Sequence, residues 1–227
     1  MNRIYALALG LLISLTPALG WTALANRDGN SGSLDYVAFG ASDAAGIGAI
    51  PLTEGYVYKV ADVLAVRGQP VALYNLGIPG ATAPDIKDAV EVFLLGQQDA
   101  DLITLWTGAN DIIQGVTAAE FRTSLRSILS QLRANTSAAI LVANLVKLNR
   151  LPRFVDEPNP RVTPARVATF NRIIHAQAAV FRAPVVNLFG DITPGDAVTS
   201  DLDGFHPNNL GHRRIAALFL RKIIPRL

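Results

Sequence analysis

Residues 34–46 read LDYVAFGASDAAG, a stretch in which an apolar run leads directly into a glycine and a serine. The run Leu34–Phe39 has the length and composition of a buried strand. Gly40 allows the chain to reverse sharply out of that strand. Ser42 then stands at the start of a helix, where backbone N–H groups and the helix dipole favour negative charge. The stretch therefore predicts a strand–turn–helix unit with a serine at the junction.

The same alternation continues along the chain. Further strands are predicted at Val71–Leu76, Asp101–Thr107, Ala138–Leu145 and Pro184–Leu188. Helices are predicted at Gly55–Arg67, Ala83–Leu95, Thr117–Arg133, Pro164–Phe181 and Asn208–Ile224. Five short apolar strands that alternate with helices predict an α/β fold, a three-layer α/β/α sandwich around a five-stranded parallel sheet. Ligands bind such sheets beyond the carboxyl ends of the strands, so functional residues are expected just after strands.

Composition excludes several classes of protein. Half of the 227 residues are apolar and 17% are charged, which suits a folded domain and not a disordered chain. The net charge is +2 and the sequence holds no basic run, so we expect no nucleic-acid partner. There is no cysteine, which excludes disulfides and thiolate metal sites.

The N-terminus has the pattern of an export signal. Met1-Asn2-Arg3 is positive, Ile4–Leu15 is apolar, and Ala23-Leu24-Ala25 is a small-x-small cleavage site. We therefore expect a signal peptide at residues 1–25, a flexible leader at 26–33 and one domain at 34–227. The mature protein is expected to be secreted or periplasmic, without a membrane span, because the apolar run is shorter than the about 20 residues a span needs. An uncleaved N-terminal anchor is the alternative.

Polar or glycine-rich segments follow three predicted strands, and another precedes the last helix. They are Gly40–Asp43, Asn75–Thr82, Gly108–Asp111 and Asp203–Pro207. Each alone has an ordinary explanation as a turn or a helix cap, and a lone histidine is often structural. Gly46-Ile47-Gly48 lacks the third glycine of a dinucleotide-binding fingerprint. His175 and His212 have no partner histidine at zinc spacing, and we interpret both as structural.

Taken together and in order, the four segments resemble the SGNH hydrolase family, also called GDSL-type esterases and lipases. The family's nucleophile serine, glycine, Gly-x-Asn-Asp asparagine and Asp-x-x-His pair correspond here to Ser42, Gly80, Asn110, Asp203 and His206. The resemblance spans nearly the whole mature chain and implies the flavodoxin-like SGNH hydrolase fold.

The resemblance also implies how the site works. Ser42 is the expected nucleophile, His206 the base and Asp203 the group that orients His206. The expected oxyanion donors are the backbone N–H groups of Ser42 and Gly80 and the Asn110 amide. No metal and no organic cofactor is needed. Asp201 competes with Asp203 as the acid, although the three-residue spacing and the family pattern favour Asp203.

One position departs from the family pattern. The first segment usually reads Gly-Asp-Ser, whereas this chain has Gly40-Ala41-Ser42 followed by Asp43. The nucleophile is kept and the preceding carboxylate is lost. We expect activity to survive, because that aspartate is no member of the triad in the family.

The substrate is expected to be a small or lipid-like carboxylic ester. The segment Val146–Thr163 lacks clear periodicity, as lids and binding loops do. Its residues Leu148, Leu151, Pro152, Phe154 and Val155 either line an acyl site or pack the loop onto the domain. Two other functions stay open: acyl transfer by the same triad, and an exported ligand- or carbohydrate-binding relative without catalysis.

Overall fold

The computed structural model describes residues 32–96 and 99–227. Its sheet has five strands in the order β2-β1-β3-β4-β5, and every pairing is parallel. The strands are β1 (Leu34–Gly40), β2 (Val71–Gly77), β3 (Leu102–Trp106), β4 (Ala139–Ala143) and β5 (Val185–Val186). The predicted signal peptide, and all of the predicted leader except residues 32 and 33, lie outside the described residues.

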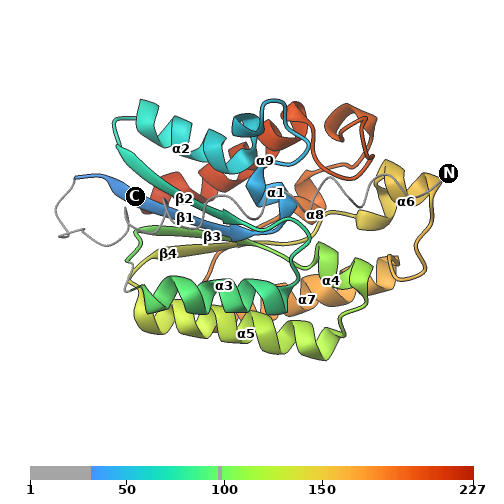
Figure 1. The fold of residues 1–227 in the computed structure, drawn as a ribbon, viewed down its shortest axis with the longest axis horizontal. Helices are drawn as coiled ribbons and strands as arrows, with labels where there is room; N and C mark the ends of the chain where they lie inside the picture. The colour runs from blue at the N-terminus through green and yellow to red at the C-terminus, as the bar shows by residue number, and fades with distance from the viewer. Residues whose placement is uncertain (1–31, 97–98) are drawn as a thin grey trace, which may run out of the picture.

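Helices cover both faces of the sheet, which confirms the predicted three-layer sandwich (Figure 1). One face carries α2 (Tyr56–Val66) and α9 (Asn209–Ile223). The other carries α3 (Ala83–Leu95), α5 (Ala118–Asn135) and α7 (Pro164–Val180). No helix in the described part of the chain combines the length and the apolar character needed to cross a bilayer.

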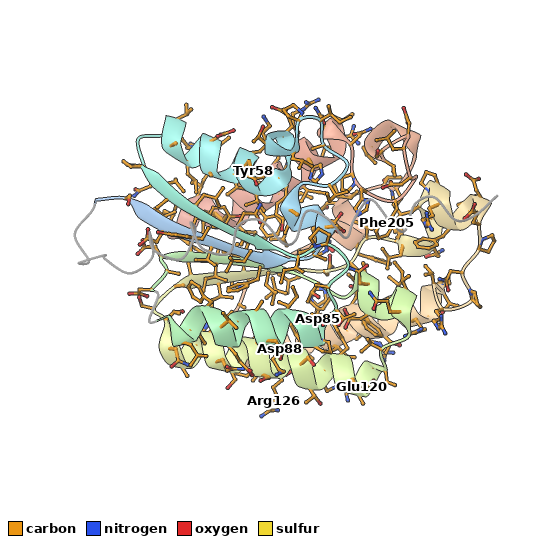
Figure 2. All side chains as sticks on the ribbon, viewed as in Figure 1. Tyr58, Asp85, Asp88, Glu120, Arg126 and Phe205 are labelled. Atoms are coloured by element: carbon orange, nitrogen blue, oxygen red, sulfur yellow. The ribbon has the colours of Figure 1, made fainter. Side chains whose placement is uncertain are left out.

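Burial explains why the strands are apolar throughout rather than alternating. Tyr36 to Phe39 of β1 are fully buried, and so are Leu102, Ile103 and Leu105 of β3, because helices pack on both sides. Charged residues point outward instead: Asp88 on α3 and Arg126 on α5 face away from the sheet (Figure 2). The predicted capping box also forms, with the Glu120 carboxylate accepting a hydrogen bond from the Thr117 N–H at 2.9 Å.

The strand order places a crevice at the carboxyl ends of β1 and β3. From β1 the chain goes to β2 on one side, and β3 then pairs with the opposite side of β1. Ligands bind at such a reversal of strand order. Two short helices begin there, α1 (Ser42–Ala45) directly after β1 and α4 (Ala109–Gln114) after β3 (Figure 1).

Two predicted segments differ from the structure. Strand β5 is shorter than predicted, because the Asn187 side chain accepts a hydrogen bond from the Gly190 N–H at 3.2 Å and starts α8 (Leu188–Asp191). The segment Val146–Thr163 contains η2 (Leu148–Arg150) and α6 (Pro152–Asp156). The remaining short helices are η1 (Leu52–Glu54), η3 (Asp196–Val198) and η4 (Ile224–Arg226).

Glycine at the end of β2 lets α1 lie directly on the sheet. A Cβ atom at Gly77 would overlap the backbone nitrogen of Ala45 and lie 2.9 Å from its Cα. Real Cβ atoms do not approach backbone so closely, and backbone cannot rotate out of the way as a side chain can. The position of α1, and of Ser42 at its start, therefore depends on the missing side chain at position 77.

Gly77→Ala should lower the free energy of unfolding by about 1–3 kcal/mol, because the methyl group overpacks the contact between β2 and α1. Urea unfolding of the two proteins measures this difference. An unchanged midpoint with an unchanged slope would show that α1 can shift away at no cost.

Candidate active site

Ser42 lies just beyond the carboxyl end of β1, as the first residue of α1. The side chain is largely buried, with 6% of its surface exposed. Gly40 precedes it at the end of β1, and a Cβ atom there would lie 2.8 Å from the Trp106 carbonyl oxygen and 2.9 Å from the Ala44 Cβ. The tight turn after β1 thus needs glycine, as the sequence predicted.

His206 lies near the C-terminal end of the sequence, on the loop before α9, and its side chain reaches Ser42. The loop is held by its own hydrogen bonds: the Ser200 N–H donates to the His206 carbonyl at 2.8 Å, and the Asn208 side chain donates to the Thr199 carbonyl at 3.0 Å. The Phe205 ring packs edge-on against the imidazole, with centroids 4.8 Å apart. These contacts fix where the imidazole points.

A hydrogen-bonded chain links the three predicted triad residues. His206 Nε2 lies 2.8 Å from Ser42 Oγ, and His206 Nδ1 lies 2.5 Å from Asp203 Oδ2. An ionised carboxylate only accepts hydrogen bonds, so Nδ1 carries the proton that it shares with Asp203. In the neutral imidazole Nε2 is then free to accept the Ser42 hydroxyl proton, which is the arrangement required of a general base.

The Asp203 carboxylate is held in its ionised form. Its second oxygen, Oδ1, accepts hydrogen bonds from the Phe205 N–H at 2.9 Å and the His206 N–H at 3.0 Å. Burial raises the pKa of Asp203, but the hydrogen bonds from the His206 side chain and from these N–H groups outweigh it, so the pKa lies below its usual value. Asp201, the competing acid, is exposed on the same loop, and the imidazole is bonded to Asp203.

Gly80 and Asn110 lie on a turn and a helix that are bonded to each other. Asn110 Nδ2 donates to the Ala81 carbonyl at 3.0 Å, and Gln114 Nε2 donates to the Gly80 carbonyl at 2.8 Å. Gly80 has φ +82°, which favours glycine, and the space around its missing Cβ is open. Ser42 and Asn110 line the same small cavity. Within residues 32–96 and 99–227, Ala81 is the one acceptor bonded to the Asn110 amide nitrogen.

Asp111 joins these two segments, a role that its sequence position alone did not reveal. Both carboxylate oxygens accept the Ala83 N–H, at 3.0 and 3.1 Å, so Asp111 caps the start of α3 across the site. Burial raises the pKa of Asp111 to about 6, although the bonds from Ala83 lower it. Asp111 lies in α4 and therefore caps a helix other than its own.

Asp43, the residue after Ser42, is a second carboxylate beside the imidazole. Burial raises the pKa of Asp43 to about 6, the charge of His206 lowers it, and the charge of Asp203 raises it. The side chain lines the cavity that holds Ser42 and Asn110. The family pattern carries its extra carboxylate before the serine, whereas this chain carries it after the serine.

The other histidines and one glycine have structural roles. His212 is fully buried; its Nε2 donates to the Ile47 carbonyl at 3.0 Å, and its Nδ1 accepts from the Tyr56 N–H at 3.2 Å. His175 lies 3.3 Å from the Asn144 amide. Gly48 has φ +93°, and a Cβ there would lie 2.8 Å from the His206 Cβ. Gly48 thus makes room for the His206 loop, whereas the atoms nearest to a Cβ at Gly46 belong to Leu52 and Gly55.

The long segment after β4 contributes only part of what was expected. Leu148 and Leu151 line an apolar pocket beside the site. Pro152 lines a separate polar groove, and Phe154 is buried with its ring edge-on to Phe205 at 5.8 Å. Val155 is 63% exposed. Leu148 and Leu151 thus line a pocket and Phe154 packs onto the domain, whereas the exposed Val155 does neither.

Comparison with solved structures shows a shared fold. The chain superposes on a lipase/acylhydrolase from Enterococcus faecalis with a TM-score of 0.69 at 24% identity, covering 86% of this chain and 97% of that one. An acetyl xylan esterase from Geobacillus stearothermophilus superposes with a TM-score of 0.69 at 22% identity, covering 85% of this chain and 95% of that one. AlinE4, an SGNH-hydrolase family esterase, superposes with a TM-score of 0.63 at 23% identity, covering 86% of this chain and 97% of that one. Among curated proteins a sequence search finds no match.

The family itself follows from the sequence. The model of the GDSL-like lipase/acylhydrolase family matches residues 38–214, which run from β1 into α9 and include all the residues of the site. This match and the fold confirm the resemblance drawn from the four segments. The chain belongs to the GDSL-like lipase/acylhydrolase family and is a hydrolase of the SGNH type that acts on ester bonds.

Proposed function

We propose that the chain is an exported serine esterase whose triad is Ser42, His206 and Asp203. The observation that carries the proposal is the hydrogen-bonded chain from Ser42 Oγ through both nitrogens of His206 to Asp203. A serine beside a base that is itself oriented by a third group is the arrangement of an activated nucleophile. The carboxyl ends of β1 and β3, where this chain of bonds lies, are also where this type of sheet binds ligands.

The first half of the reaction forms an acyl-enzyme. Ser42 Oγ attacks the ester carbonyl carbon while His206 Nε2 takes the hydroxyl proton. The ionised Asp203 stabilises the imidazolium that results, and the two backbone N–H groups on its other oxygen keep the carboxylate in place. When the tetrahedral intermediate collapses, His206 returns the proton to the alcohol oxygen, and the alcohol leaves.

The second half releases the acid. Water enters, His206 takes one of its protons, and the hydroxide oxygen attacks the acyl carbon of the ester with Ser42. Collapse returns the proton to Ser42 Oγ and frees the carboxylic acid. During both halves negative charge develops on the carbonyl oxygen, and we assign the N–H groups of Ser42 and Gly80 and the free amide hydrogen of Asn110 to its stabilisation.

The substrate class we propose is a carboxylic ester with a small or lipid-like acyl group. Apolar residues beside the site, among them Leu148 and Leu151, support an acyl group. The similar structures include a lipase/acylhydrolase and an acetyl xylan esterase, so their substrates also span acyl and acetyl esters. Transfer of the acyl group to another alcohol uses the same intermediate and is tested by adding acceptor alcohols.

Ser42→Ala should abolish both labelling by a fluorophosphonate and hydrolysis of p-nitrophenyl butyrate, because no other group can take the place of the activated oxygen. Mass spectrometry of the labelled protein and the release of p-nitrophenol measure the two effects. The control is Ser130→Ala, which removes an exposed serine on the outer surface of α5 and should leave both unchanged. Labelling that persists in Ser42→Ala would assign the nucleophile elsewhere.

Asn110→Ala should lower kcat by about 10²–10³-fold with a much smaller change in KM, because the amide acts on charge that develops only in the transition state. Steady-state kinetics on p-nitrophenyl butyrate separates the two constants. Asn135→Ala, at the far end of α5, is the control for loss of an amide. A kcat near that of the parent would remove Asn110 from the oxyanion site.

We further propose that residues 1–25 are cleaved during export and that the mature chain begins at Asn26. The support is the positive start, the apolar run and the Ala-Leu-Ala site in the sequence. Intact mass measured on protein from the periplasm or medium of a bacterial host should match a chain starting at Asn26. A membrane-bound product that retains Met1 would instead favour the N-terminal anchor.

A further inference from the structure

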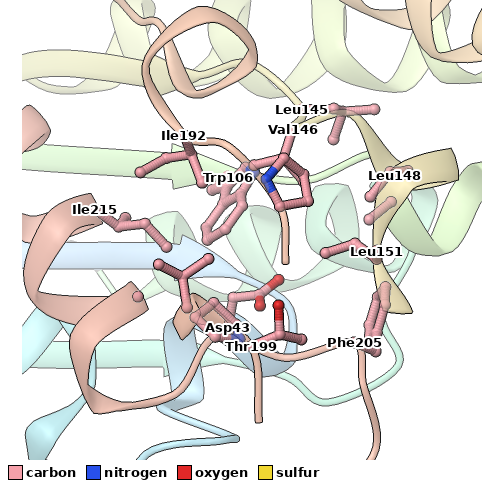
Figure 3. A pocket seen from close by; sticks show the side chains of 15 residues that line it. Asp43, Trp106, Leu145, Val146, Leu148, Leu151, Ile192, Thr199, Phe205 and Ile215 are labelled. Atoms are coloured by element: carbon pink, nitrogen blue, oxygen red, sulfur yellow. The ribbon is translucent and has the colours of Figure 1, made fainter. Parts of the chain in front are cut away.

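An apolar pocket opens beside the nucleophile, between the His206 loop and the segments that follow β3, β4 and β5. Its cavity volume is about 40 Å³, and it is partly open to solvent. Its walls are formed by buried side chains that include Trp106, Leu145, Leu148, Leu151, Ile192 and Ile215 (Figure 3). Residues from the N-terminal and the C-terminal parts of the sequence thus line the same pocket.

The pocket adjoins the cavity that holds Ser42 and Asn110. Four residues line both spaces: Asp43, Trp106, Ala109 and Phe205. The apolar pocket therefore lies directly beside the space in which a group attached to Ser42 would sit. Phe205, which packs against the imidazole, forms part of the boundary between the two.

Asp43 is the one charged side chain among the described residues that line the apolar pocket. Figure 3 shows its carboxylate pointing into the space, near Thr199 and opposite Leu151. Thr199 is the other lining residue with a hydroxyl or carboxyl group, and its hydroxyl donates to the Gly195 carbonyl at 2.8 Å. Within the described chain, no group of another residue donates a hydrogen bond to the Asp43 carboxylate.

We propose that this pocket receives the acyl group of the ester and that Asp43 selects acyl groups that carry a hydroxyl. The inference rests on the proposed function, because it needs the acyl group to be attached to Ser42. It makes Asp43 a specificity-determining residue that contacts the substrate without taking part in the covalent steps.

The acyl group fits the pocket better than the alcohol does. The alcohol must leave before water can attack, so an enclosed binding site for it would hold the product in the way of the second half-reaction. The acyl group stays on Ser42 throughout and leaves only as the acid. An enclosed apolar pocket next to the nucleophile is therefore suited to the part of the substrate that remains.

A hydroxyl on that acyl group supplies a hydrogen-bond donor to the buried Asp43 carboxylate. A plain alkyl chain would remove water from Asp43 and offer no hydrogen bond in return, which is the costly way to bury a polar group. A hydroxyl donates to the carboxylate and needs no counter-charge. An ammonium group would also pair with it, but its own desolvation in an apolar pocket is far more costly.

The raised pKa of Asp43 supports this reading, since the carboxylate has too little solvent or partner contact in the free enzyme to ionise at its usual pH. The titratable groups around it are His206 and Asp203 on the loop before α9 and Tyr56 on α2. Asp43 is neutral below about pH 6 and charged above it. Discrimination against plain alkyl chains should accordingly increase as the pH rises through that value.

The test compares p-nitrophenyl butyrate with p-nitrophenyl 3-hydroxybutyrate. The ratio of their kcat/KM values isolates the acyl pocket, because both esters need the same triad and its contribution cancels in the ratio. We expect the parent enzyme to prefer the hydroxylated ester by about tenfold or more at neutral pH, which is the factor that one hydrogen bond to a charged group supplies. The ratio should fall toward acid pH, with a midpoint near the pKa of Asp43.

Two variants and a control assign the preference to Asp43. Asp43→Leu should reduce the ratio to about one or below, because it removes the acceptor and makes the wall apolar. Asp43→Asn keeps an acceptor, so part of the preference should remain while its pH dependence disappears; this variant carries the test if Asp43→Leu does not fold. Asp201→Asn removes an exposed carboxylate on the His206 loop and should leave the ratio unchanged.

The outcomes separate this inference from the proposed function. Hydrolysis of both esters at equal rates, or a preference that persists in Asp43→Leu, would overturn the role of Asp43 and leave the triad intact. A preference that follows a hydroxyl on the alcohol instead of the acyl group would also overturn it. Failure of the parent to be labelled by a fluorophosphonate and to hydrolyse either ester would overturn the proposed function itself.

Discussion

The hydrogen bond between Ser42 Oγ and His206 Nε2 joins residues that are 164 positions apart, at a distance of 2.8 Å. The rest of the site depends on this contact between two distant parts of the sequence. Ser42 is placed by β1 and by the glycines that let α1 lie on the sheet. His206 is placed by a loop that is bonded to itself and to the start of α9. A hydrogen bond tolerates errors of only a few tenths of an ångström, so both elements must be positioned by packing that does not yield.

Carboxylates set the electrostatics of this region, and each is in a different environment. Asp203 accepts two backbone N–H groups and the imidazole, and its pKa is lowered on balance, which suits a residue that must stay ionised. Asp111 is fully buried and accepts one N–H group from α3, and its pKa is raised to about 6. Asp43 faces an apolar pocket, and burial raises its pKa to about 6 as well. Three aspartates within one site therefore differ in role because their hydrogen-bond partners differ.

The departure from the family pattern becomes interpretable in this setting. Position 41, directly before Ser42, is an alanine that is buried with 8% of its surface exposed. It therefore brings no carboxylate to the site. The carboxylate at Asp43 lies instead on the side of α1 that faces the apolar pocket. Ala41 precedes α1 with a non-helical backbone conformation, whereas Asp43 is the second residue of the helix. The two arrangements therefore present charge to different neighbours, although their sequences look similar.

Sequence alone determined the alternation of strands and helices, the parallel sheet, the family and the expected site residues, because buried parallel strands are continuously apolar and their ends carry the polar segments. Their boundaries were predicted to within about two residues at each end, with β4 and β5 both shorter than predicted. Only the tertiary structure decided that Asp203 and not Asp201 bonds the imidazole, that Asp111 caps α3, and that Asp43 lines a pocket shared with Ser42. Local pattern determines local conformation, whereas these contacts join residues far apart in the sequence, and their geometry is settled only when the whole core packs.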